Sequence, residues 1–185
     1  MRAVVETCAP RREVLGGELT EDIFAARLRD VIEGRAPRVY QDPDVFFENT
    51  YPTHGLRLLL TEALGRLTGQ QSASNAVIRL ETAFGGGKTH NLIALYHVAS
   101  GAVSASQVRR IVGPELVPAP GTVDIVGVVG SDLDPSTGLL HEDTGVRTYT
   151  LWGELAHQLG GAESYALARA SDENRAAPGT GHFEE

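Results

Sequence analysis

Phe84-Gly85-Gly86-Gly87-Lys88-Thr89-His90 carries the strongest indication of fold class in this chain. Lys88 is the sole lysine, and the other basic side chains apart from histidine are all arginines. A compact ammonium placed after glycines and before a hydroxyl is typical of a phosphate-binding loop. In such a loop, backbone N–H groups surround the phosphates, the lysine bridges their oxygens and the threonine binds Mg²⁺. The pattern therefore predicts that Lys88 contacts phosphate and that Thr89 is a metal ligand.

The residues on either side of the glycines supply the order strand, loop, helix that this motif requires. Residues 76–80 are apolar and partly β-branched, which predicts a short strand. Residues 90–99 carry apolar side chains on nearly every side, which predicts a buried helix. The free N–H groups and the dipole at the start of such a helix both favour an anion.

The loop departs from the full pattern, Gly-x-x-x-x-Gly-Lys-Ser/Thr, at its first position. With Gly87 as the second glycine, the first falls on Thr82, which must avoid a positive φ angle. Gly85 and Gly86 are expected to take over the tight backbone geometry. The alternative interpretation is a glycine hinge beside an incidental lysine. The expected nucleotide-binding residues are Thr82, Ala83, Phe84, Gly85, Gly86, Gly87, Lys88, Thr89 and His90.

The rest of the chain completes an α/β prediction with parallel strands. Residues 122–130 are apolar on both faces, as in a strand of a covered parallel sheet. Asp-Pro-Asp at residues 42–44 predicts a turn. Periodicity and capping residues predict helices over residues 20–34, 53–68, 104–112, 151–160 and 163–174. We therefore expect an accessory helical segment over residues 1–52 and an incomplete nucleotide-binding domain over residues 53–185.

Composition restricts the class of protein. A hydrophobic content of 42% over 185 residues is enough for a buried core. The net charge of -8 argues against a surface that is one large phosphate-binding patch. Cys8 is the single cysteine, which fits a reducing compartment, and no stretch has the length of a membrane span. A cytoplasmic protein without a membrane partner is expected.

Weaker candidates flank the loop and the second predicted strand. Glu81 is interpreted as a strand-end acid or as a contact to Mg²⁺-bound water. Asp132 and Asp134 follow the strand only after an intervening Gly-Ser pair, so a turn-stabilising role is favoured over a metal role. Arg109 and Arg110 are interpreted as a solvated helix face or as an arginine finger that acts on a neighbouring subunit.

Hydrolysis would need further groups, because an acid must hold Mg²⁺ and another must orient water. These acids usually come from another strand of the same sheet, and no further run of apolar β-formers follows Gly130. The sequence is therefore interpreted as the front part of a longer ATPase. By itself it is expected to hydrolyse ATP poorly or not at all.

Four stretches together resemble a known family. They are Pro10-Arg11-Arg12-Glu13-Val14-Leu15, Phe46-Phe47-Glu48-Asn49-Thr50-Tyr51-Pro52-Thr53, Arg79-Leu80-Glu81-Thr82-Ala83-Phe84-Gly85-Gly86-Gly87-Lys88-Thr89-His90 and Val129-Gly130-Ser131-Asp132-Leu133-Asp134-Pro135. On these residues the chain resembles the N-terminal part of the bacterial ATPases of the domain-of-unknown-function 499 family, which are described as anti-phage-associated and occur beside DNA-modification genes.

The resemblance implies an AAA-type P-loop NTPase that binds ATP and Mg²⁺. It implies that a residue other than glycine is tolerated at Thr82, that the Walker B strand lies beyond Glu185, and that Asp132 and Asp134 are not its acids. The stretch from Phe46 to Thr53 is expected near the adenine. Expected partners are defence-complex or DNA-modification proteins, DNA through other regions, and further copies of the chain.

Two other functions remain open at this point. One is a nucleotide-dependent interaction module without significant hydrolysis, and the other is a P-loop kinase. The preference between ATP and GTP is also open.

Overall fold

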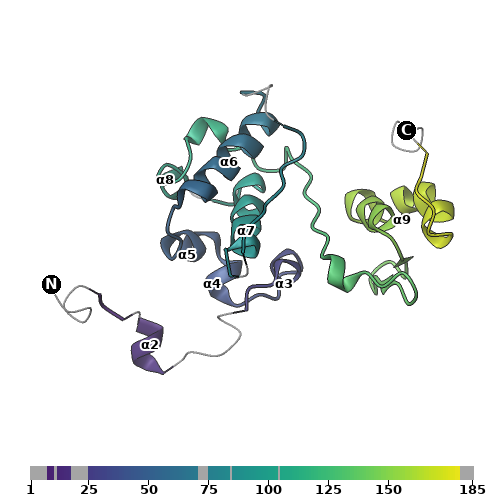
Figure 1. The fold of residues 1–185 in the computed structure, drawn as a ribbon, viewed down its shortest axis with the longest axis horizontal. Helices are drawn as coiled ribbons and strands as arrows, with labels where there is room; N and C mark the ends of the chain where they lie inside the picture. Colours follow the sequence, from purple (N-terminus) through teal and green to yellow (C-terminus); the bar gives the residue numbers. More distant parts are fainter. Residues whose placement is uncertain are drawn as a thin grey trace.

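The structure is a computed structural model and describes residues 8–10, 12–17, 25–70, 75–83, 85–103 and 105–179. Its helices are α2 (Arg12–Gly16), α3 (Leu28–Ile32), α4 (Arg38–Gln41), α5 (Pro43–Glu48), α6 (His54–Leu67), α7 (Lys88–Ala99), α8 (Ala105–Val108) and α9 (Leu151–Glu173). Short 3-10 turns follow at η2 (Pro114–Leu116) and η3 (Gly130–Asp132), and the strands are β1 (Leu139–Leu140) and β2 (Arg147–Thr148). Figure 1 shows α3 to α8 gathered in one body and joined by an extended stretch to the part that contains α9.

The main hydrophobic core lies between α6 and α7, with contributions from both sides of the sequence. Val31 of α3 and Phe46 of α5 pack into the same cluster as Leu60 and Ile93. The fully or nearly fully buried members are Val31, Phe46, Leu56, Leu60, Leu64, Ile93, Ala94 and Val98. Residues 26–52 therefore share their core with the helix that follows the glycine loop, which places this N-terminal part against the predicted site.

Helix α6 confirms the helix predicted over residues 53–68. Its apolar positions Leu56, Leu60 and Leu64 recur every four residues and are buried. The helix begins where the Thr53 side chain accepts a hydrogen bond from the backbone N–H of Leu56, at 3.2 Å. A local cap and a local period together explain why this element could be read from the sequence.

Helix α7 likewise confirms the buried helix predicted over residues 90–99, although it begins earlier, at Lys88. It ends before Gly101, whose φ of 69° is left-handed. Five of its residues are buried: Ile93, Ala94, His97, Val98 and Ala99. Leu92 is 39% exposed, so one side of the helix is left uncovered.

The turn predicted at residues 42–44 is wrong, because these residues start a helix. The Asp42 side chain accepts hydrogen bonds from the N–H groups of Asp44 (3.1 Å) and Val45 (3.2 Å), and Pro43 occupies the first helical turn. Aspartate before proline suits a helix N-terminus as well as a turn. Helix α3 covers only the end of the helix predicted over 20–34, of which residues 20–24 lie outside the described part. Ser104, the expected cap of the helix at α8, also lies outside it.

The two predicted parallel strands do not form a sheet in this structure. Residues 77–80 and 124–129 have no regular secondary structure, and the described residues form strands only at β1 and β2. Those strands pair antiparallel, with Leu139 opposite Thr148 and Leu140 opposite Arg147. A β-rich composition specifies an extended chain, whereas a strand also needs a neighbour that supplies its hydrogen bonds.

Helix α9 joins the two C-terminal helices that were predicted over 151–160 and 163–174. The break between them is present as a kink, because Gly160 and Gly161 leave helical geometry and Gly161 has φ of 63°. Thr150 caps the start by accepting from the N–H of Gly153 at 3.2 Å. In the part of the chain that the structure describes, no helix has the length and apolar character to cross a membrane.

Candidate functional site

The glycine loop adopts the tight backbone that only glycine accepts easily. Gly85 and Gly87 have φ of 78° and 75°, in the left-handed region. Gly86 has an ordinary φ but no space for a side chain, because a Cβ there would lie 2.5 Å from Cβ and Oγ1 of Thr82. Glycine is therefore favoured at residues 85 and 87 by their backbone conformation and at residue 86 by lack of space. Together the three glycines form a tight turn directly before α7.

Lys88 is turned back over this loop. Its Nζ donates to the backbone O of Thr82 (3.0 Å), to Oγ1 of Thr82 (3.0 Å) and to the backbone O of Ala83 (3.3 Å). Gly86 N–H also donates to Ala83 O, at 3.1 Å, which closes the loop on itself. The ammonium is exposed and its three acceptors carry no charge, so an anion at the loop could recruit it.

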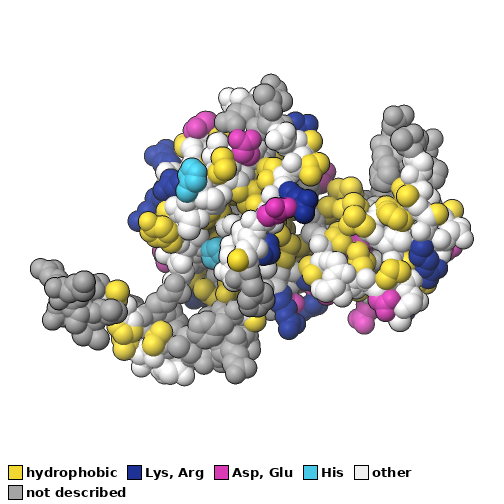
Figure 2. Space-filling view, in the orientation of Figure 1, with side chains coloured by type: hydrophobic (Ala, Val, Ile, Leu, Met, Phe, Trp, Pro, Cys, Tyr) yellow, Lys and Arg dark blue, Asp and Glu magenta, His cyan; other side chains and the backbone are white. Residues whose placement is uncertain are grey.

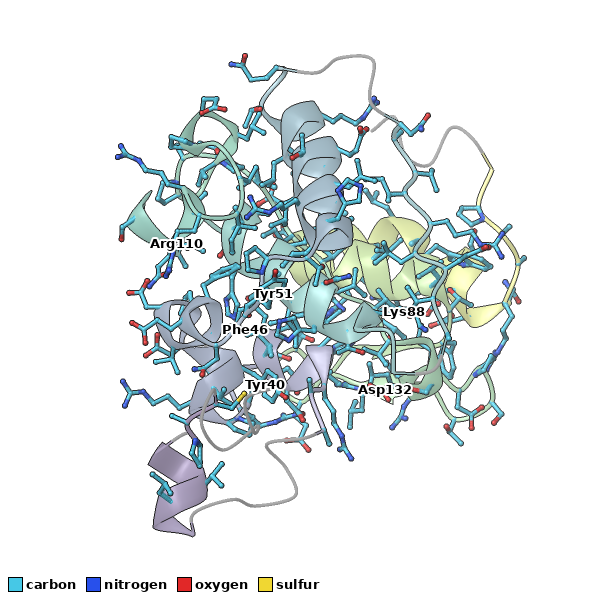
Figure 3. The ribbon with its side chains drawn as sticks, turned by 60° about the vertical axis from the view of Figure 1, so that its left-hand side comes forward. Tyr40, Phe46, Tyr51, Lys88, Arg110 and Asp132 are labelled. Carbon is cyan, nitrogen blue, oxygen red and sulfur yellow. The ribbon has the colours of Figure 1, made fainter. Side chains whose placement is uncertain are left out.

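Thr89 lies in the first turn of α7 and faces a cavity. This cavity, of about 870 Å³, is also lined by the chain after the second extended segment, including Ser131 and Asp132, and by Arg27 and Arg29 near α3. Its volume is within the range of small-molecule sites. Figure 3 shows Lys88 at the start of α7 and Asp132 on the neighbouring ribbon. The structure thus brings Asp132 toward Thr89 although the sequence separates them widely.

Asp132 lines the cavity and also forms an ion pair with an arginine. Arg29 NH1 contacts Oδ2 of Asp132 at 3.1 Å, and Arg29 Nε contacts Oε1 of Glu33 at 2.9 Å. Burial acts to lower the pKa of Arg29, but the hydrogen bonds to Glu33 and Asp132 outweigh it and raise that pKa. This pairing joins α3 to the end of the extended segment.

His90 points away from the loop, although its position in the sequence places it in the predicted set. Its Nε2 lies 2.9 Å from Oγ1 of Thr50, and its ring stacks on Phe46 with centroids 4.5 Å apart. Burial lowers the pKa of His90, which favours the neutral imidazole. In this geometry His90 connects α7 to the stretch from Phe46 to Thr53, the stretch that the resemblance places near the adenine.

The weaker candidates have ordinary surroundings. Glu81 is exposed and pairs with Arg79 at 2.7 Å. Asp134 accepts from the hydroxyl of Ser136 at 2.5 Å and from its N–H at 2.8 Å, as in a turn, and these hydrogen bonds lower the pKa of Asp134. Arg109 and Arg110 are both exposed. Phe84 lies outside the described residues.

A second polar cluster lies in the part of the chain that contains α9. The rings of His141 and His157 stack with centroids 3.8 Å apart, and His141 Nε2 lies 2.9 Å from Oε2 of the buried Glu154. Burial opposes ionisation of Glu154, yet hydrogen bonds from Thr148, Gln158 and His141 hold its pKa below the usual value. Among the described residues, no group of three or more His, Cys, Asp or Glu side chains is arranged to hold a metal ion.

Sequence reasoning missed Thr50 and Arg29 as parts of the site's surroundings. Thr50 reaches His90 across 40 positions and Arg29 reaches Asp132 across 103 positions. No local pattern reports such contacts. The block resemblance of residues 46–53 was the available signal for Thr50.

The comparison with protein families gives one result. The model of the DUF499 N-terminal domain matches residues 5–185. The chain belongs to this family. No curated protein and no solved structure matches it.

Proposed function

We propose that this DUF499 N-terminal domain binds ATP with Mg²⁺ at the loop formed by residues 82–89, in the manner of a P-loop NTPase of the AAA type. The observation that carries the proposal is the position of Lys88. Its ammonium is turned back over the glycine loop, directly at the N-terminus of a helix of 12 residues.

The loop suits a phosphate in shape and in charge. Gly86 lets the loop close tightly on itself, because a Cβ there would collide with Thr82, and the absence of side chains at residues 85–87 leaves the backbone N–H groups accessible to an anion. The first N–H groups of α7 have no partner inside the helix, and its dipole favours negative charge. Lys88 adds a mobile cation that can exchange its neutral acceptors for phosphate oxygens. Thr89, at the edge of the neighbouring cavity, is suited to hold Mg²⁺ beside the phosphates.

We infer further, from the family resemblance, that ATP turnover serves a bacterial anti-phage system that includes DNA-modification proteins. In this proposal residues 82–89 bind the nucleotide, and ATP hydrolysis depends on acids that the resemblance places in another strand. Asp132 approaches Thr89 across the cavity, but its ion pair with Arg29 favours a structural role.

Calorimetric titration with ATP and Mg²⁺ tests the site. The native chain should bind, and Lys88→Ala should weaken binding by about tenfold or more, since a charge-assisted contact to phosphate is lost. Arg169→Ala is the matched control, because it removes an exposed cation of α9 outside the loop and should leave the affinity unchanged. Equal affinity in the native chain and in Lys88→Ala, with both folded by circular dichroism, would refute the proposal.

A further inference from the structure

Thr82 stands where the phosphate-loop pattern has its first glycine, and its side chain contacts the loop in two ways. Its hydroxyl accepts a hydrogen bond from Nζ of Lys88 at 3.0 Å. Its Cβ and Oγ1 also lie against Gly86, where an added Cβ would be 2.5 Å from each of them. A glycine at residue 82 would make neither contact. The side chain of Thr82 is therefore a working part of this loop.

The ammonium of Lys88 has three N–H donors, and three oxygens of the loop accept from it. Two are backbone oxygens, those of Thr82 at 3.0 Å and Ala83 at 3.3 Å, and the third is the Thr82 hydroxyl. This hydroxyl donates its own hydrogen to the O of Ala83 at 3.3 Å, so its lone pairs are left for Lys88. Each hydrogen bond from Nζ to a phosphate oxygen must therefore replace a bond to the loop.

Within the described part of the chain, no carboxylate forms an ion pair with Lys88. The acids pair with arginines instead, and Figure 2 shows basic (dark blue) and acidic (magenta) side chains that adjoin on the helical body. Glu81, which directly precedes Thr82, pairs with Arg79 at 2.7 Å. The acceptors of Lys88 are uncharged, and a charged phosphate oxygen is a stronger acceptor than any of them. Phosphate can therefore displace the contacts that hold this lysine.

We propose that the Thr82 hydroxyl is an internal competitor for Lys88 and thereby sets the affinity of the loop for the phosphates of a nucleotide. The inference rests on the proposed function, because it concerns the same loop and the same lysine. The two backbone acceptors keep Nζ over the loop whatever side chain stands at residue 82. The hydroxyl occupies the third donor, so its removal should strengthen nucleotide binding. A residue that binds phosphate itself would have the opposite effect.

The contact between Thr82 and Lys88 can be tested without nucleotide. Lys88 is the sole lysine, so lysine labelled with carbon-13 gives a single Cε signal, whose relaxation reports motion of the side-chain end on the ps–ns timescale. Thr82→Val keeps the branched shape and removes the hydroxyl, so the order parameter of Cε should fall. Thr82→Ser keeps the hydroxyl and should retain the native order parameter. Equal order parameters in the native chain and in Thr82→Val overturn the inference, whatever the chain binds.

Calorimetric titration with ATP and Mg²⁺ tests the competition itself. Thr82→Val should bind ATP about threefold more tightly than the native chain, since one internal hydrogen bond no longer has to be replaced. Thr82→Ser should have the native affinity. Thr68→Val is the matched control, because it removes a hydroxyl that donates to the O of Leu64 at 2.8 Å at the end of α6, and it should leave the affinity unchanged. Native or weaker affinity in Thr82→Val overturns the inference.

A double-mutant cycle shows whether Thr82 acts through the lysine. In a chain that already carries Lys88→Ala there is no ammonium to release, so the further change Thr82→Val should leave the affinity for ATP unchanged. The same gain in affinity with and without Lys88 would assign the effect to the shape of the loop and would overturn the inference.

The outcomes separate this inference from the proposed function. If Lys88→Ala weakens ATP binding and Thr82→Val does not strengthen it, the competition by Thr82 is refuted and the nucleotide site stands. If the native chain and Lys88→Ala bind ATP equally, the nucleotide site is refuted and the role of Thr82 with it. Absence of ATP binding in both the native chain and Thr82→Val likewise refutes both.

Discussion

A methyl group added at Gly86 should weaken nucleotide binding and leave the fold intact. The Cβ of alanine would lie 2.5 Å from both Cβ and Oγ1 of Thr82 and 3.0 Å from the O of Ala83. Contacts of this length between non-bonded heavy atoms are repulsive, so Thr82 or the loop must move. Thr82 supplies two of the three acceptors of Lys88, each at 3.0 Å, so the lysine loses its anchor at the same time.

The sizes of the two effects should differ. The loop is exposed, and exposed charged contacts contribute below about 1 kcal/mol to folding. For a chain of this length the melting temperature should therefore fall by less than about 4 °C. Displacement of the donors that surround a phosphate should cost about tenfold or more in affinity, or ~1.4 kcal/mol.

Calorimetric titration with ATP and Mg²⁺, together with thermal denaturation, separates these effects. Gly55→Ala is the control, because Gly55 is exposed in the first turn of α6 with no atom within 4 Å of an added Cβ. It should leave the affinity unchanged and stabilise the chain by about 0.4–1 kcal/mol. Native affinity in Gly86→Ala, with a native melting curve, would falsify the idea that the tight loop is the phosphate cradle.

Two further predictions concern the scaffold. Asp172 is fully buried and accepts hydrogen bonds from Tyr165 OH (3.0 Å), Tyr149 N–H and Thr150 Oγ1–H. Asp172→Ala should therefore lower the free energy of unfolding by about 3 kcal/mol in urea denaturation, and a loss below about 1 kcal/mol would contradict this account. Burial lowers the pKa of His97 in the folded chain, so the unfolded chain binds the proton more tightly and the free energy of unfolding should fall as the pH drops below about 6.5. In His97→Gln, the free energy of unfolding should fall less between about pH 7 and pH 5.5, and a fall equal to that of the native chain would exclude a role for His97.

The helices could be predicted because their signals are local. In α6, the Thr53 cap and the buried positions Leu56 and Leu60 lie within two turns of one another. The kink in α9 follows from adjacent glycines, one of which takes φ of 63°. Neighbouring residues alone decide such features, so a single sequence carries them.

The two parallel strands could not be predicted reliably, because their formation depends on contacts that are not local. Residues 122–129 have the β-branched composition of a buried strand, but no described backbone pairs with residues 123–128. The short hairpin of β1 and β2 was not predicted, because two residues per strand leave no periodic pattern. Pairing depends on a partner segment, and composition does not name that partner.

The candidate site divides in the same way. The order of Gly85, Gly86, Gly87 and Lys88 placed the loop before the helix without any tertiary information. The direction of His90 toward Thr50 and the approach of Asp132 to Thr89 came only from the fold. Side-chain direction in the first turn of a helix depends on what packs there, in this case Phe46.

Neighbouring residues alone set the local form of the glycine loop, because left-handed glycines, a helix N-terminus and a lysine act over a few consecutive bonds. The surroundings of that loop come from the fold: the Arg29–Asp132 pair, the His90–Thr50 contact and the groove beside α7. These features depend on segments far apart in the chain, whose contacts are selected by packing of the whole core rather than by neighbouring residues.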